Sequence, residues 1–393
     1  MDKVKKTNRK MTKREFLRYS ICGACGIALG FSVIDSIAGK ILHPEKSLPV
    51  FPPDKPWKWS KEASFYIQTP RGIKCLICPN ECVITDDKPS ICQNRELYQG
   101  KLYSIAYGNP CAVHIDPIEK KPLNHFLPSS LSYSIATAGC NLKCLNCQNW
   151  SISQASPRDT RNYDLMPAQV VEECIKNKCA SIAYTYSEPV TFYEYTYDTA
   201  RLAREKGIRN VMVTAGYINE KPLRQLCSVI DAANVDLKSF SDEVYMMLNA
   251  GSLDPVLNTL KIMKEEGVWL EITNLVVPTW TDDMDLIREM CRWLVSNGFE
   301  DTPLHFSRFH PEYQLPNLPP TPLSTLTKAR DIATGEGLRY VYIGNVPGDT
   351  SSNTYCPNCK KLLIERKGYT ITKNDITDSK CRYCSEEVAG VWG

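Results

Sequence analysis

Residues 140–147 read Cys-Asn-Leu-Lys-Cys-Leu-Asn-Cys, and they follow directly after an apolar run at 131–137 that we predict to be a β-strand. The C-x-x-x-C-x-x-C spacing puts three thiolates on one loop, where they can hold three of the four irons of a cubane cluster. Bacterial ferredoxins instead combine C-x-x-C-x-x-C with a distant fourth cysteine. The spacing therefore predicts a [4Fe–4S] cluster on Cys140, Cys144 and Cys147 with one iron open. A three-cysteine zinc site is the alternative.

Short apolar runs alternate with helical stretches on the carboxyl-terminal side of this loop. The runs are apolar on nearly every residue, which is typical of parallel strands whose faces are covered by helices. We predict strands at 131–137, 180–185, 209–214, 233–237, 268–276, 303–309 and 338–343, and helices near 167–177, 192–206, 220–230, 254–266, 282–297 and 322–334. The alternation predicts an α/β fold, a partial (β/α)6 barrel, with its active site at the carboxyl ends of the strands.

The rest of the chain divides into smaller parts around this barrel. Residues 44–59 carry five prolines and two tryptophans, a composition typical of an extended linker. We predict five segments: a signal-like segment at 1–40, a Pro-rich linker at 41–64, an N-terminal Cys-rich module at 65–128, the core at 129–348 and a zinc-ribbon-like module at 349–393.

The first forty residues have the pattern of a targeting segment. A basic stretch leads into Thr-Lys-Arg-Glu-Phe-Leu-Arg at 12–18, and a mildly apolar, Gly-rich run follows to about residue 38. This resembles a twin-arginine signal in which Lys13 replaces the first arginine. The segment predicts export or tethering to a membrane, and an uncleaved cytoplasmic extension is the alternative.

Cysteine is over-represented, with 18 residues in a chain of 393, and eleven of them fall in three closely spaced groups. Such spacing is typical of metal ligands rather than of a disulfide scaffold. The second group is Cys75, Cys78, Cys82 and Cys92, where we favour zinc over an auxiliary cluster. The third is Cys356, Cys359, Cys381 and Cys384, which has the paired spacing of a zinc ribbon, with a rubredoxin-like iron as the alternative.

The charge balance argues against one class of partner. The chain has 47 basic and 44 acidic residues, a formal net charge of +3. So small an excess does not indicate a nucleic-acid partner.

The isolated cysteines are predicted to be core residues: Cys111, Cys174, Cys179, Cys227 and Cys291.

Several motifs together resemble one family. The triad loop is similar to that of the radical S-adenosylmethionine (SAM) superfamily, in the branch of the pyruvate formate-lyase activating enzymes. The sequence resembles still more closely the radical SAM enzyme of the AmmeMemoRadiSam system. The motifs that carry this resemblance lie at 140–150, 116–123, 125–128, 184–189, 305–311 and 340–345.

The resemblance implies a reaction and its cofactors. An open iron would chelate SAM and pass an electron to its sulfonium, which gives methionine and a 5′-deoxyadenosyl radical that takes hydrogen from a substrate. It implies a low-potential electron donor and Memo-like and AMMECR-like partner proteins. A glycyl-radical activase is a second possibility within the branch, and a non-catalytic metal-binding electron carrier is a third from another class.

The resemblance also assigns residues to the site. It implies contacts with SAM by a set of residues at strand ends: Ser187, Glu188, Asp236, Lys238, His310 (or His305), Gly344 and Asn345. Lys121 and His125 belong to the segment just before the predicted cluster strand, where they can line the substrate pocket as catalytic candidates, with a solvated charged loop as the alternative. Two positions depart from the family, namely Asn146, where an aromatic residue is common, and Ala215, where asparagine is common.

Overall fold

The computed structural model describes residues 55–346, 348 and 350–393. The predicted signal segment at 1–40 and the first part of the linker, 41–54, lie outside the described residues. Among the helices that are described, none combines the length and the apolar character needed to cross a membrane.

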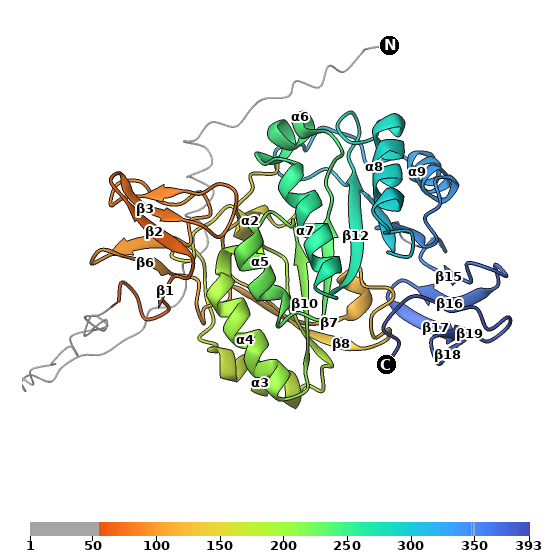
Figure 1. Cartoon of the computed structure of the whole chain (residues 1–393), viewed down its shortest axis with the longest axis horizontal. Helices are drawn as coiled ribbons and strands as arrows, with labels where there is room; N and C mark the ends of the chain where they lie inside the picture. Colours follow the sequence, from red (N-terminus) through yellow and green to blue (C-terminus); the bar gives the residue numbers. More distant parts are fainter. Residues whose placement is uncertain (1–54, 347, 349) are drawn as a thin grey trace, which may run out of the picture. The chain divides into compact units, whose positions relative to one another are not determined.

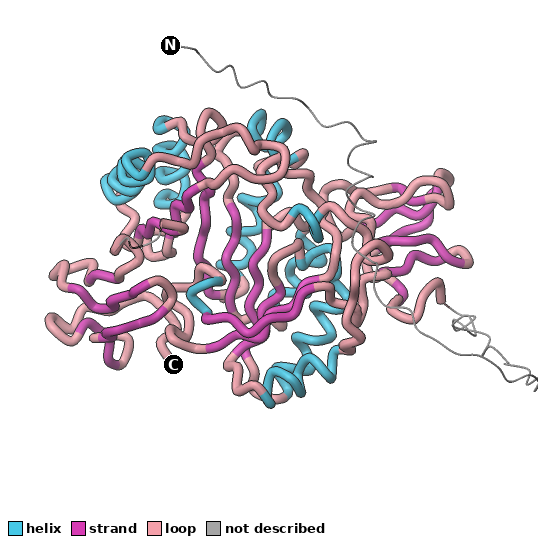
Figure 2. The backbone as a smooth tube through the Cα atoms, turned by 180° about the vertical axis from the view of Figure 1, so that it is seen from behind, coloured by secondary structure: helices cyan, strands magenta, loops and turns pink. Residues whose placement is uncertain are grey.

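One eight-stranded sheet organises the central part of the chain (Figures 1 and 2). Its order is β14-β13-β12-β11-β10-β9-β8-β7, and every neighbouring pair is parallel except β7 with β8. The bounds are β7 Ala112–Pro117, β8 Leu131–Ala136, β9 Ser181–Tyr184, β10 Arg209–Thr214, β11 Ala232–Asp236, β12 Trp269–Val276, β13 Leu304–Arg308 and β14 Val341–Gly344. The seven predicted strands are confirmed as β8 to β14, and β7 is an addition that the sequence did not reveal.

Six helices connect the seven parallel strands, so the predicted (β/α)6 alternation is present with one further strand. The helices are α3 Pro167–Lys176, α4 Tyr193–Glu205, α5 Glu220–Cys227, α7 Asp254–Glu265, α8 Met284–Ser296 and α9 Leu323–Gly335. β9 is buried along its whole length, as expected for a strand covered on both faces. Because β7 and β14 are the two edges of the sheet, the barrel is open.

Short helical elements lie in the connections, several of them at the carboxyl ends of the strands. These are η1 Ile118–Lys120, α2 Trp150–Ser153, η2 Pro189–Phe192, α6 Asp242–Val244 and the π-helical η3 Tyr245–Asn249. η2 begins at a proline and is capped by Glu188, whose side chain accepts a hydrogen bond from the Val190 amide.

Two small antiparallel sheets precede the barrel (Figure 1). One has the order β1-β6-β5 and the other β2-β3-β4. Their bounds are β1 Lys61–Glu62, β2 Tyr66–Thr69, β3 Gly72–Cys75, β4 Val83–Ile84, β5 Arg95–Tyr98 and β6 Lys101–Ser104. The small sheets therefore end at Ser104, and β7, within the segment predicted as the Cys-rich module, already belongs to the barrel sheet.

The carboxyl-terminal residues form a three-stranded sheet, β15-β16-β17, and a two-stranded ribbon, β18-β19. Their bounds are β15 Thr354–Tyr355, β16 Leu362–Lys367, β17 Thr370–Asn374, β18 Ile376–Thr377 and β19 Lys380–Cys381. The last residues return to the barrel, since the Val391 amide donates to the carbonyl of His125 and the Leu127 amide donates to the carbonyl of Val391, both at 2.7 Å.

Candidate active site

The triad loop follows the carboxyl end of β8, where parallel α/β sheets bind their ligands. Its backbone is held by segments far away in the sequence. The contacts are Lys143 N–H to Asn249 O at 2.8 Å, Leu145 N–H to Leu248 O at 2.9 Å and Gln314 N–H to Leu145 O at 3.0 Å. The loop is therefore shaped by η3 and by the segment after β13 as well as by its own sequence.

The three thiols of the triad are not grouped like the ligands of a single metal ion. Among the described residues, the group placed to hold one ion, with its ligand atoms all within 4.8 Å of one another, is the carboxyl-terminal one, and it does not include Cys140, Cys144 or Cys147. Thiolates on separate irons of a cubane point away from its centre and must be farther apart than ligands of one ion. The three-cysteine zinc alternative is thus disfavoured. Burial raises the pKa of Cys140 and of Cys147, so metal binding must displace their protons.

Glu188 is buried close to this loop, after the end of β9. One carboxylate oxygen accepts from Thr214 Oγ1 at 2.6 Å and the other from the Ala215 amide at 2.8 Å. Burial raises the pKa of Glu188, and these hydrogen bonds oppose that rise. A buried carboxylate with acceptor capacity left over is suited to binding a cationic amino group. The departure at Ala215 is immaterial to this contact, because the backbone supplies the donor.

Asp236 and Lys238 form an ion pair of 2.9 Å at the carboxyl end of β11. Burial would lower the pKa of Lys238, but the negative charges of the Asp236 carboxylate and of a Cys144 thiolate raise it. The ammonium therefore stays protonated beside the triad loop. The predicted pair is brought to the cysteines, where it can offset negative charge.

The segments after β9 and β13 and the end of β14 contribute further predicted residues at the same end of the sheet. Ser187 donates from its hydroxyl to the carbonyl of Thr137 at 2.6 Å. The ring of His310 lies 3.4 Å from the carbonyl of Asn345, whose side chain donates to Arg308 O at 2.8 Å. Gly344 ends β14. Polar groups from β9, β11, β13 and β14 are therefore gathered where the triad loop lies.

Comparison with known proteins identifies this arrangement. A family model described as the radical SAM superfamily matches residues 134–291, which contain the triad, Glu188, Asp236 and Lys238. An uncharacterized protein of Methanocaldococcus jannaschii is 46% identical over 331 residues, covering 84% of this chain and 98% of the relative. The chain belongs to the radical SAM superfamily.

A further curated relative supports the branch of this radical SAM enzyme. The pyruvate formate-lyase 1-activating enzyme of Escherichia coli (strain K12) is 24% identical over 220 residues, which cover 52% of this chain and 89% of the relative. The branch is therefore similar to that of the pyruvate formate-lyase activating enzymes. A solved domain of such an enzyme from Bacteroides vulgatus matches with 16% identity, covers 42% of this chain and 99% of that one, and has a TM-score of 0.38.

Radical SAM membership implies a [4Fe–4S] cluster and SAM, and the residues present fit both. Cys140, Cys144 and Cys147 supply three thiolates and no fourth cysteine lies within their motif. The amide oxygen of Asn146, next to Cys147, is buried without a hydrogen-bond partner in the described structure. A polar atom left unpaired beside the loop is expected where a polar ligand binds.

Lys121 lies in a buried ion pair beside the radical SAM site. Its ammonium contacts Asp116 Oδ2 at 2.5 Å and lies 3.4 Å from the hydroxyl of Tyr186, which also donates to Asp116. Burial lowers the pKa of Lys121 to about 8, against the opposing effect of Asp116. Tyr186 adopts φ +64°, a left-handed conformation that is strained for a tyrosine. Sequence reasoning missed Tyr186 as a site residue, although it lies inside the 184–189 motif.

His125 lies at the opposite end of the radical SAM barrel from the triad. It is fully buried, its Nδ1 donates to the carbonyl of Ala389 at 2.6 Å and its Nε2 accepts from the hydroxyl of Tyr342 at 2.5 Å. Burial lowers the pKa of His125 to about 4, so the ring is neutral at physiological pH. Its contacts are those of a group that joins the barrel to the carboxyl-terminal residues.

His305 belongs to the same buried network rather than to the triad end. Its Nε2 lies 2.7 Å from Glu271, and that carboxylate also accepts from the amides of Asn124 and His125. Burial alone would raise the pKa of Glu271, but His305 lowers it overall. Of the two histidines weighed for the methionine end of SAM, only His310 lies after the carboxyl end of β13.

The carboxyl-terminal cysteines form a compact group that could hold a metal ion. The sulfurs of Cys356 and Cys384 lie 3.6 Å apart, and those of Cys359 and Cys381 lie 3.7 Å apart. Four sulfurs at about 2.3 Å from one central ion form a tetrahedron with edges of about 3.8 Å. The four thiols are therefore placed as the ligands of one tetrahedral ion.

Proposed function

We propose that this radical SAM enzyme abstracts hydrogen from a substrate as the AmmeMemoRadiSam type does. The observation that carries the proposal is the triad loop at the carboxyl end of β8 with the buried carboxylate of Glu188 beside it. When bound, the cluster and SAM supply a 5′-deoxyadenosyl radical. The motifs at 116–123, 184–189 and 305–311 support the finer assignment.

The residues of the chain would divide the work of binding and orientation. Glu188 and the neighbouring backbone would hold the amino group of SAM, and His310 would lie at its methionine end. Lys238, kept charged by Asp236, would balance the thiolates. Gly344 and Asn345 would approach the adenine from the end of β14.

Lys121 would face the substrate together with Tyr186. Its pKa of about 8 lets it hold or release a proton near neutral pH. Tyr186 donates to Asp116 and directly precedes Ser187 and Glu188 in the chain. A substrate that displaces Tyr186 would therefore also shift the segment that binds SAM.

The experiment is an anaerobic assay for 5′-deoxyadenosine after cluster reconstitution, reduction and addition of SAM, with Cys144→Ala as the control. Product that disappears in the control supports the proposal. An intact cluster that yields no product under a strong reductant would favour the electron-carrier alternative, unless a partner protein restores cleavage.

A glycyl-radical activase is the second candidate, and the similarity to the Escherichia coli pyruvate formate-lyase 1-activating enzyme favours it. The two candidates differ in their partners. If the protein forms a glycyl radical on a glycyl-radical enzyme, and electron paramagnetic resonance detects it, the activase is supported. Complex formation with Memo-like and AMMECR-like proteins would support the first proposal, and either would use a low-potential electron donor.

The carboxyl-terminal site would hold zinc, as its tetrahedral sulfurs suit that ion, with rubredoxin-like iron as the alternative.

Export or membrane tethering through residues 1–40 is a separate proposal, with a cytoplasmic location as its alternative. Fractionation of cells that express a carboxyl-terminally tagged chain tests it, because recovery solely in the cytosol at full length would contradict export.

A further inference from the structure

The amino-terminal cysteines, like the radical SAM triad, lie outside the compact carboxyl-terminal group of four sulfurs. Cys75 ends β3 and Cys82 precedes β4, and the Cys75 amide donates to the carbonyl of Cys82 at 3.0 Å. Cys78 lies in the loop between them. Within the described residues, the group of thiols placed to hold one ion is the carboxyl-terminal four, and it includes none of these cysteines. Thiolates on separate irons of a cubane lie farther apart than the ligands of one ion, so a cluster suits the amino-terminal group better.

The backbone around these thiols is already folded as a ligand loop. The Ile77 amide donates to the sulfur of Cys75 and the Asn80 amide donates to that of Cys78, in each case two residues further along. The triad has the same pattern, from Leu142 to Cys140 and from Asn149 to Cys147, and so does the carboxyl-terminal site, from Asn358 to Cys356 and from Tyr383 to Cys381. The pattern therefore indicates metal ligation in all three groups. Amide donors to metal-bound sulfur stabilise the thiolate charge and tune iron–sulfur clusters.

The same thiols lie directly against the triad loop. The side chain of Asn80 donates to the carbonyl of Asn141 at 2.7 Å, and the Asn141 side chain in turn hydrogen-bonds the thiol of Cys78. On the other side, a Cβ built on Gly139 would lie 2.5 Å from the carbonyl oxygen of Cys92. The residues before and after Cys140 therefore each touch one of the amino-terminal cysteines.

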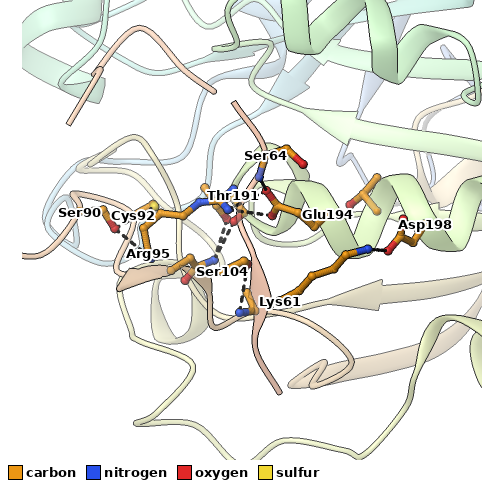
Figure 3. Close-up of polar contacts among 12 residues, drawn as sticks. Lys61, Ser64, Ser90, Cys92, Arg95, Ser104, Thr191, Glu194 and Asp198 are labelled. Atoms are coloured by element: carbon orange, nitrogen blue, oxygen red, sulfur yellow. Dashed lines mark hydrogen bonds and ion pairs between the residues drawn. The ribbon is translucent and has the colours of Figure 1, made fainter. Parts of the chain in front are cut away.

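A buried cation lies beside the group. Arg95 is 2% exposed and its Nη1 bonds both oxygens of Glu194 on α4, at 2.9 and 2.8 Å (Figure 3). Its Nη2 is buried without a partner in the described structure. Ser90 connects the two groups, because its hydroxyl accepts from the Arg95 amide at 3.2 Å and lies 3.3 Å from the sulfur of Cys92 (Figure 3). A free, buried guanidinium donor indicates an anionic ligand nearby.

We propose that Cys75, Cys78, Cys82 and Cys92 bind a second [4Fe–4S] cluster, which lies next to the SAM-binding loop. Four thiolates would complete the coordination of all four irons, so this cluster would have no open site for SAM. This assignment replaces the zinc that the cysteine spacing alone had favoured. It concerns the ligands of the amino-terminal group and stands even if the substrate proposal fails.

The test is the metal content of the Cys140→Ala/Cys144→Ala/Cys147→Ala variant after anaerobic reconstitution. We expect it to retain about four iron and four sulfide ions per chain, as one [4Fe–4S] cluster contains, and the wild type to hold about eight of each. A triple variant that contains no sulfide and carries two zinc ions per chain would overturn the proposal. Either result is independent of SAM cleavage.

Matched single variants and spectroscopy complete the design. Cys82→Ser should lose about half of the wild-type iron, whereas Cys111→Ser, a partly exposed cysteine outside every group, should lose none. The reduced triple variant should give a [4Fe–4S] resonance that SAM does not change. In the reduced wild type, magnetic coupling should make the spectrum differ from the sum of the two single-cluster spectra, and simple additivity would contradict the adjacent placement.

Discussion

At the scale of single residues, Glu188 tests the SAM site. In Glu188→Gln, one carboxylate oxygen becomes an amide nitrogen that cannot accept from Thr214 or Ala215, and the negative charge is lost. A hydrogen bond to a charged group contributes about 1.5–3 kcal/mol, so we expect SAM to bind about 10- to 100-fold more weakly. Equilibrium dialysis of the reconstituted protein measures this. The control is Glu172→Gln on the exposed face of α3, and equal affinity in both variants would refute the assignment.

A second prediction at this scale concerns His125 and the pH dependence of the free energy of unfolding. Its pKa is about 4 in the folded chain against 6.5 for an ordinary histidine, so the stability that it contributes is present above pH 6.5 and is lost as the pH falls toward 4. Three other titratable groups face its ring: Glu271 favours the protonated form, and Arg366 and His305 oppose it. Between pH 7.5 and 5 this group alone should reduce the free energy of unfolding by about 2 kcal/mol. Urea unfolding at both values should show a smaller loss in His125→Gln, and an equal loss would contradict the prediction.

At the scale of elements, the contact between the triad loop and the amino-terminal sheets depends on Gly139. It has φ +101°, and an added Cβ would lie 2.2 Å from Asn94 Oδ1 as well as against Cys92. Gly337 has a similar φ of +110°, yet its nearest neighbour would be 3.8 Å away. Because only Gly139→Ala adds overpacking to the backbone strain, it should destabilise the chain by about 1–3 kcal/mol more than Gly337→Ala. Thermal unfolding of the two variants compares them, and equal losses would show that the contact is not tight.

The same elements show what the sequence could and could not predict. The parallel strands and their helices were found because buried parallel strands are apolar on nearly every residue. β7 was missed because it is an antiparallel edge strand, with His114 and Ile115 exposed and Pro117 at its end. The three cysteine groups were found from local spacing. Their partners were not, because Cys92 and Gly139, or Lys121 and Tyr186, are brought together only by the folded chain. His125 shows the same limit, since its burial against Ala389 involves residues more than 260 positions apart.

At the scale of the whole molecule, the carboxyl-terminal metal site should stabilise the barrel as well as its own sheets. Arg366 on β16 donates to the carbonyl of Asn124 at 2.8 Å, and Ala389 holds the ring of His125. Cys384→Ser should remove the metal without creating a cavity, because Cys384 is exposed. We expect the loss of one zinc ion per chain and a lower melting temperature, since metal binding free energy is folding free energy. Cys111→Ser is the control, and an unchanged melting temperature in Cys384→Ser would show that the site is uncoupled from the barrel.

The clamping of the triad loop has a consequence for how the holoenzyme matures. The loop takes its shape from contacts with Asn80 on one side and with Leu248, Asn249 and Gln314 on the other. During synthesis, the last of these residues leaves the ribosome some 170 positions after Cys144. A nascent chain therefore exposes three reactive thiols long before their geometry is set. We therefore expect the cluster to be inserted after most of the barrel has been synthesised. Iron that binds earlier would meet thiols whose relative positions are not yet fixed.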